Sequence, residues 1–88
     1  MKTIEIQFPE WVKPGTFYEY DYGPVYGRDN PNQGRRFEIR GFVDGRAVVR
    51  EWHAESERWS YTVEGPYNFL ILEHLGDVRV IGDQGTAQ

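Results

Sequence analysis

The chain has 88 residues with 10 Lys and Arg against 14 Asp and Glu, a formal net charge of -4. This length allows one small hydrophobic core and not two, and the acidic balance argues against nucleic acid, whose binding usually draws on a basic face. The absence of Cys excludes disulfides and thiolate metal sites, and we expect neither a metal nor a cofactor.

The first predicted strand runs from Thr3 to Phe8, where apolar and polar residues alternate. Pro9 should end it, and Trp11 in the turn-rich connection that follows should cover one end of the core. Thr16 to Tyr22 is predicted as a second strand with three aromatic side chains on one side: Tyr18, Tyr20 and Tyr22. These rings either pack over the core with hydroxyls at its rim or form an aromatic shelf for a partner.

The segment from Gly23 to Arg35 is predicted to be a long loop, because its thirteen positions hold three Gly, two Pro, two Asn and an Asp. Tyr26, Arg28, Arg35 and the adjacent Arg36 make it the most basic part of an acidic chain. These are either ordinary surface charges or an anion-recognising loop, in which guanidinium groups bind a carboxylate or a phosphate.

The stretch from Arg36 to Glu64 is predicted to form three consecutive antiparallel strands. Its first turn is Asp44-Gly45, a strong signal for a two-residue hairpin that pairs Val43 with Arg46. Counting outward gives four further predicted pairs: Phe42 with Ala47, Gly41 with Val48, Ile39 with Arg50 and Phe37 with Trp52.

A second turn at Glu55-Ser56 would make Arg50 pair with Tyr61 and Trp52 with Trp59. The two registers together predict one apolar face made of Phe37, Ile39, Val48, Trp52, Trp59, Tyr61 and Val63. The opposite face then holds Glu38, Arg40, Val49, Glu51, Ser60 and Thr62. Arg50 is the exception on the apolar face, and we expect it to snorkel over the aromatic rings, to stack on them, to pair with Glu19 or Asp21, or to await an anionic ligand.

After a break at Gly65-Pro66, Tyr67 to Leu75 fits a short helix that ends at Gly76, with a buried strand as the alternative. Helical spacing places four apolar side chains together: Tyr67, Leu70, Ile71 and Leu75. Asp77 to Ile81 is predicted as a closing strand with Val78 and Val80 inward, and residues 83–88 as a flexible tail.

These elements predict a single, mainly β domain over residues 1–82. It would be a small barrel or a strongly bent antiparallel sheet of five to six strands, with a helical turn near residues 66–75. The element order resembles the Src-homology-3-like small barrel, and FYEYDYG at 17–23 is similar to the strand that opens the long loop in its peptide-binding family. The loop carries Arg where that family is acidic, so the resemblance implies the fold and no proline-rich ligand.

The leading functional prediction is a non-enzymatic binding or adaptor module with a Tyr- and Arg-rich surface. Its partner would be a protein or an anionic small molecule, and a homodimer is left open. The predicted contact residues are Tyr18, Tyr20, Tyr22, Tyr26, Arg28, Arg35, Arg36 and Arg50.

The alternative is a small-molecule-binding protein or enzyme with a site at an oligomer interface, and its candidate residues are His53, His74, Glu51, Asp21 and Arg50. Single-stranded nucleic-acid binding ranks third, because aromatic platforms are present without a positive groove. No apolar run is long enough to cross a bilayer, so we expect a cytoplasmic protein without a membrane partner.

Overall fold

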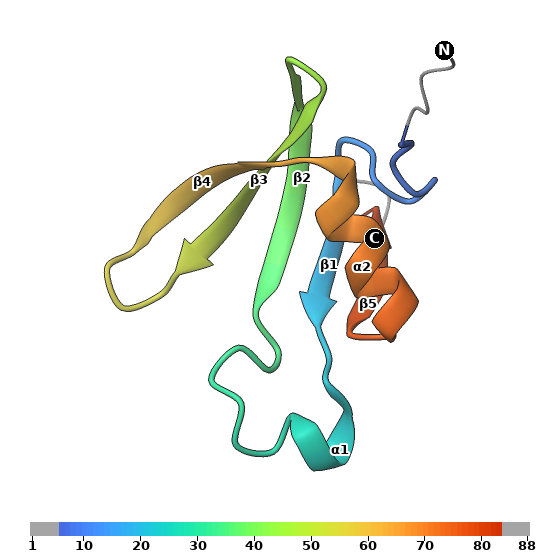
Figure 1. Ribbon diagram of the computed structural model, residues 1–88. Helices are drawn as coiled ribbons and strands as arrows, with labels where there is room; N and C mark the ends of the chain where they lie inside the picture. Colours follow the sequence, from blue (N-terminus) through green and yellow to red (C-terminus); the bar gives the residue numbers. More distant parts are fainter. Residues whose placement is uncertain (1–5, 84–88) are drawn as a thin grey trace.

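The computed structural model describes residues 6–83 of the chain. Its strands are β1 (Thr16–Tyr20), β2 (Arg36–Val43), β3 (Arg46–His53), β4 (Arg58–Glu64) and β5 (Val78–Asp83), and its helices are α1 (Gly23–Tyr26) and α2 (Pro66–Leu75). The strands form one antiparallel sheet in the order β4-β3-β2-β1-β5, and α2 packs on one face of it (Figure 1). The predicted mainly β fold with a five-stranded antiparallel sheet and a helix near residues 66–75 is therefore confirmed.

The sheet does not close into a barrel, because β4 and β5 are its two edges and are not paired with each other. Three residue pairs join β1 to β2, whereas seven join β3 to β4. The long β2-β3-β4 meander therefore extends away from β1 and α2, as Figure 1 shows. The barrel alternative is wrong for this reason, and what remains of the predicted architecture is a small open sheet.

Both hairpin turns of the meander form as predicted. Asp44 and Gly45 have φ angles of 49° and 75°, the two positive values that a type I′ turn requires. Val43 pairs with Arg46 next to this turn, and Trp52 pairs with Trp59 across the second hairpin. The complete predicted register between β3 and β4 is confirmed.

The register between β2 and β3 changes at Arg40, where a β-bulge adds one residue to β2. Ile39 pairs with Val49 and Glu38 pairs with Arg50, so the predicted pairing of Ile39 with Arg50 is wrong. The predicted pairing of Phe37 with Trp52 is wrong for the same reason. A one-residue shift moves every following side chain to the opposite face, and the bulge therefore decides which residues enter the core.

The two faces of the sheet differ from the predicted ones for this reason. The inner face, which α2 covers, holds a core that includes Val49, predicted to lie on the other side. The outer face holds Glu38 and Arg50 together with three exposed aromatic residues, Trp52, Trp59 and Tyr61. The buried hydrophobic residues are Val12, Tyr18, Phe37, Ile39, Ala47, Val49 and Phe69.

Helix α2 begins at Pro66 and ends before Gly76, whose φ of 74° gives the left-handed C-cap that glycine favours. Its core contact is Phe69, which is 1% exposed. Trp11 packs against the same ring at 5.7 Å and against Tyr18 at 5.5 Å, as predicted for a residue that covers one end of the core. Three of the side chains that helical spacing groups together are exposed instead: Tyr67, Ile71 and Leu75.

The two ends of the chain differ from prediction in part. The predicted strand at 3–8 lies partly outside the described residues, and its described part, 6–8, is not in a strand. The predicted tail at 83–88 lies outside them except for Asp83, which ends β5. Val78 packs on the core as predicted, whereas Val80 is 40% exposed. Within residues 6–83 no helix has the length and apolar character needed to cross a membrane.

The long loop is more ordered than its composition indicates. It begins with the single helical turn of α1, and the carboxylate of Asp21 ties its two ends together. Asp21 Oδ1 accepts hydrogen bonds from the Gly23 backbone N–H and from Gln33 Nε2, each at 3.1 Å. These two bonds hold the pKa of Asp21 below its ordinary value.

Candidate functional site

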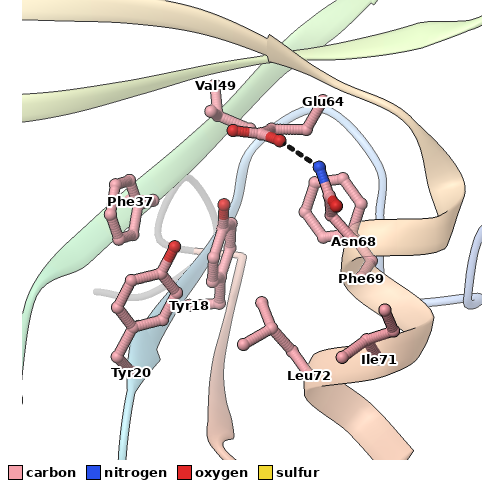
Figure 2. Close-up of a pocket in the computed structure, with 9 residues that line it drawn as sticks. All are labelled: Tyr18, Tyr20, Phe37, Val49, Glu64, Asn68, Phe69, Ile71 and Leu72. Carbon is pink, nitrogen blue, oxygen red and sulfur yellow. Dashed lines mark hydrogen bonds between the residues drawn. The ribbon is translucent and has the colours of Figure 1, made fainter. Parts of the chain in front are cut away.

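A cleft of about 250 Å³ lies between α2 and the inner face of the sheet. We call it the α2 cleft, and Figure 2 shows it between the strand and helix ribbons. One wall comes from the sheet and the other from α2, so the cleft depends on how α2 packs. Nine residues line it: Tyr18, Tyr20, Phe37, Val49, Glu64, Asn68, Phe69, Ile71 and Leu72.

Aromatic rings form most of the floor of the α2 cleft. Alternation along β1 puts Tyr18 and Tyr20 on the inner face, where Tyr18 stacks on Phe37 at 5.3 Å with an interplanar angle of 19°. Phe69 meets the Tyr18 ring edge-on at 5.7 Å and 78°. These contacts fix the rings in place, since packed aromatic pairs add about 0.5–1.5 kcal/mol each beyond their burial.

The hydroxyl of Tyr18 is directed into the α2 cleft without a partner. The Tyr18 side chain is 2% exposed, yet no hydrogen bond from its hydroxyl to another residue of 6–83 is present. Among those residues no fully enclosed side-chain polar atom lacks a partner, so this hydroxyl must be open to the cleft. In Figure 2 the hydroxyls of Tyr18 and Tyr20 both point toward the end of the cleft where Glu64 lies.

Both tyrosines are held in the neutral form. Burial raises the pKa of Tyr18 far above its ordinary value, and the neighbouring Tyr20 and the Glu64 carboxylate add to the increase. Burial also raises the pKa of Tyr20, with Tyr22 adding to it and Arg35 opposing it. Each hydroxyl can therefore donate one hydrogen bond and accept others at neutral pH.

Glu64 supplies the charge of the α2 cleft. It is the only ionisable carboxylate, and no basic side chain is present, among the nine described residues that line the cleft. Asn68 lies one helical turn further along and donates a hydrogen bond from Nδ2 to Glu64 Oε1, as Figure 2 shows. This bond orients the carboxylate at the end of the cleft and leaves its negative charge uncompensated there.

Arg35 and Glu51 form a neutral pair beside the cleft. The guanidinium of Arg35 donates from Nε and Nη2 to the two carboxylate oxygens of Glu51 at 2.8 and 2.6 Å, a bidentate geometry. It also lies 5.3 Å from the centre of the Phe37 ring. The bond from Arg35 lowers the pKa of Glu51. A second hollow of about 160 Å³ contains this pair and shares Tyr20, Phe37 and Glu64 with the α2 cleft.

The predicted contact residues do not form one surface. Tyr18 and Tyr20 line the cleft, and Arg35 borders it. Tyr22 contacts Tyr20 with ring centres 6.0 Å apart, but it does not line the cleft. Arg36 and Arg50 lie on the outer face, where they line a hollow of about 370 Å³ to which Arg35 also belongs. Arg28 is exposed on the loop, and Tyr26 is 83% exposed in α1.

Arg50 has both kinds of partner that were predicted for it. Its guanidinium carbon lies 3.6 Å from the centre of the Trp59 ring, and its Nε donates to Glu38 Oε1 at 2.7 Å. The predicted carboxylates Glu19 and Asp21 are not its partners, because the bulge brings Glu38 opposite Arg50 instead. Glu19 is bound by Arg36 and Arg79.

His53 forms the one His–Ser contact among residues 6–83, and its geometry differs from that of a catalytic triad. Its Nε2 lies 2.7 Å from Ser60 Oγ and 3.7 Å from Glu51 Oε1. In a triad the serine and the carboxylate contact different ring nitrogens, so that a proton can pass from serine to histidine. His74 is exposed in the last turn of α2.

Comparisons of the chain with protein-family models, with curated proteins and with solved structures found no match. The site is therefore defined by its geometry. Sequence reasoning missed most of its helix side, because Ile71 is the one member of the predicted helix group that lines the cleft. The missed residues are Glu64, Asn68, Phe69 and Leu72. Each lies three or four positions from another of them, the spacing that places side chains on one side of a helix, and this spacing could have identified them.

Proposed function

We propose that the chain is a non-enzymatic binding module whose recognition site is the α2 cleft. The observation that carries this proposal is the Tyr18 hydroxyl, which stands at the end of a buried ring, opens into the cleft and has no hydrogen-bond partner within residues 6–83. No bond of this hydroxyl holds the fold together, and Phe would provide the same stacking. A ligand that bonds to the hydroxyl would account for Tyr at this position.

The surroundings of Tyr18 also fit a binding role. Ligand sites are usually concave and mostly apolar, with a few convergent polar groups, and the cleft combines aromatic and aliphatic walls with two hydroxyls and one carboxylate. Because the rings are packed against one another, little side-chain entropy is lost when a ligand binds.

The arginines have a different place in this proposal from the one predicted. Arg36 and Arg50 already pair with carboxylates on the outer face, so we assign them to the fold. Arg35 borders the cleft but holds Glu51 in a bidentate pair. An anionic ligand stays a prediction, and it would have to compete with Glu51 for Arg35. A protein partner stays a prediction as well.

The proposal is tested by locating where small molecules bind. A set of water-soluble fragments is titrated into ¹⁵N-labelled protein, and amide shifts are followed. We expect the shifts of most hits to cluster on β1 and α2 around Tyr18 and Phe69. The variant Leu72→Trp, which fills the cleft, should abolish them, whereas Leu75→Trp on the exposed side of α2 should not. Hits that cluster on the outer face, or that survive Leu72→Trp in a folded protein, contradict the proposal.

A further inference from the structure

We infer that the α2 cleft selects a small alkylammonium group, with Glu64 as its counter-ion and the half-buried ring of Tyr20 as its main aromatic contact. This inference rests on the proposed binding function of the cleft and adds the chemical class of the ligand. Three independent features of the cleft support it, namely its charge, its rings and its size.

The charge of the cleft favours a cation. Glu64 is the one charged side chain among the described lining residues, and its only hydrogen-bond donor there, Asn68, is neutral. The nearest guanidinium in the adjoining hollow, that of Arg35, is already neutralised by Glu51. A cation near Glu64 therefore meets a carboxylate without a competing positive partner, while an anion would meet repulsion.

The aromatic floor favours the same charge. A cation positioned over the face of a Tyr or Phe ring is attracted by the ring quadrupole, most strongly where water is excluded. Four rings line the cleft, and three of them, Tyr18, Phe37 and Phe69, are already buried by their packing. Tyr20 is only half-buried, so its ring is the one that the methylene or methyl groups of an alkylammonium would cover. The Tyr18 hydroxyl could bond to a polar group attached to them.

The size of the cleft limits the ligand to a few carbon atoms. At about 250 Å³ it lies just below the usual range of small-molecule pockets, which begins near 300 Å³. A free ammonium ion of the size of choline would fit, and so would the end of a lysine or methylated lysine side chain from another protein. The chemistry at the cleft is the same for both sources.

Three probes of nearly equal shape separate charge from shape. They are choline, the neutral 3,3-dimethylbutan-1-ol and the anion 3,3-dimethylbutanoate, each titrated into ¹⁵N-labelled protein. We expect choline to shift the amides around Tyr18, Glu64 and Phe69, and to bind at least about tenfold more tightly than the neutral isostere, a preference of about 1.4 kcal/mol. A short neutral peptide with trimethyllysine then identifies the source. Tighter binding than choline indicates a protein ligand, and equal or weaker binding a free cation, and either result supports the ligand class.

Two variants assign the preference to Glu64. Glu64→Gln keeps a carbonyl that can accept the bond from Asn68, so the fold should be retained, and choline affinity should fall about tenfold. Glu55→Gln removes the same charge from an exposed turn and should leave the affinity unchanged. Equal weakening in both variants would mean that only overall charge matters, which overturns the role of Glu64.

The outcomes separate this inference from the proposed function. If the neutral probe or the anion binds the cleft as tightly as choline does, the ligand class is wrong while the binding site stands. If none of the three probes shifts the cleft amides, and the fragment set also leaves them unchanged, the inference and the binding function both fail. Because the charge series uses the unaltered protein, the test holds even if Glu64→Gln does not fold.

Discussion

The guanidinium carbon of Arg50 lies 3.6 Å from the centre of the Trp59 ring. The contact is a diagonal one across the β3-β4 hairpin, because Arg50 pairs with Tyr61 and Trp59 pairs with Trp52. The same group donates to Glu38 Oε1 at 2.7 Å and to the Tyr61 hydroxyl at 3.3 Å. Arg50 thus links β2, β3 and β4 on the outer face, where no helix covers the sheet. The methylene groups and the guanidinium of Arg50 cover an aromatic surface that would otherwise be more exposed to water.

Replacing Arg50 and Trp59 together should lower the free energy of unfolding by less than the sum of the two single replacements. In a double-mutant cycle with Arg50→Ala and Trp59→Ala, we expect a coupling of about 0.5–2 kcal/mol in the free energy of unfolding, as for a partly desolvated cation–π contact. Urea denaturation measures it. His53 and Arg58 pair across the same hairpin, and the side-chain contacts of His53 are to Ser60 and Glu51 instead. The pair of His53 and Arg58 provides a control cycle with a coupling near zero. A coupling near zero for Arg50 and Trp59 would show that their contact does not stabilise the folded protein.

Phe69 should be the most sensitive residue of α2. It is 1% exposed and touches Phe8, Trp11 and Tyr18, so Phe69→Ala should lower the free energy of unfolding by about 3–5 kcal/mol. Small domains have a free energy of unfolding of about 5–15 kcal/mol in total, so Phe69→Ala could unfold the protein. Phe69→Leu is the variant that should remain folded, with a smaller loss. Tyr67→Ala, at an exposed position of the same helix, should change stability by less than about 0.5 kcal/mol. Equal effects at both positions would contradict this packing of α2.

Glu51 should contribute to loss of stability in acid. Its bond to Arg35 lowers its pKa below the ordinary value of 4.5 in the folded state, so folding favours the ionised form. The resulting stabilisation is fully present above the ordinary pKa and is lost as the pH falls through the folded-state pKa. Urea midpoints measured from pH 7 to pH 3 should therefore fall less steeply in Glu51→Gln than in the unaltered chain. Glu55→Gln, at an exposed turn, should keep the original profile. Identical profiles in all three proteins would exclude a role for the Arg35–Glu51 pair.

Local signals in the sequence predicted the elements well. Asp44-Gly45 fixes a type I′ hairpin because both residues must accept positive φ, and Pro66 and Gly76 mark the two ends of α2 because each suits only one end of a helix. These are short-range effects, and both hairpins and the helix form where they were expected.

Local signals could not predict which residues lie on each face of the sheet. The strand glycine Gly41 beside the bulge at Arg40 is a local signal for an irregular strand, but it does not fix the register. The bulge reverses which side of β2 meets which side of β3. Val49 enters the core and Trp52 leaves it as a result. The α2 cleft was missed for a related reason, because it forms only when the tyrosines of β1 meet Glu64 and Phe69, which are more than 40 positions away in the chain. Tyr18 and Tyr20 were predicted as binding residues from their own strand pattern, and both line the cleft.

The free energy of unfolding of Tyr18→Phe tests the central claim most directly, because it asks whether the hydroxyl serves the fold. The hydroxyl has no partner within residues 6–83 and the ring packs in the same way without it, so the variant should be as stable as the unaltered chain or more stable by up to about 1 kcal/mol. Urea denaturation of the two proteins at neutral pH gives this difference. A loss of more than about 1 kcal/mol would show that the hydroxyl has a structural partner, and it would contradict the assignment of Tyr18 to a ligand.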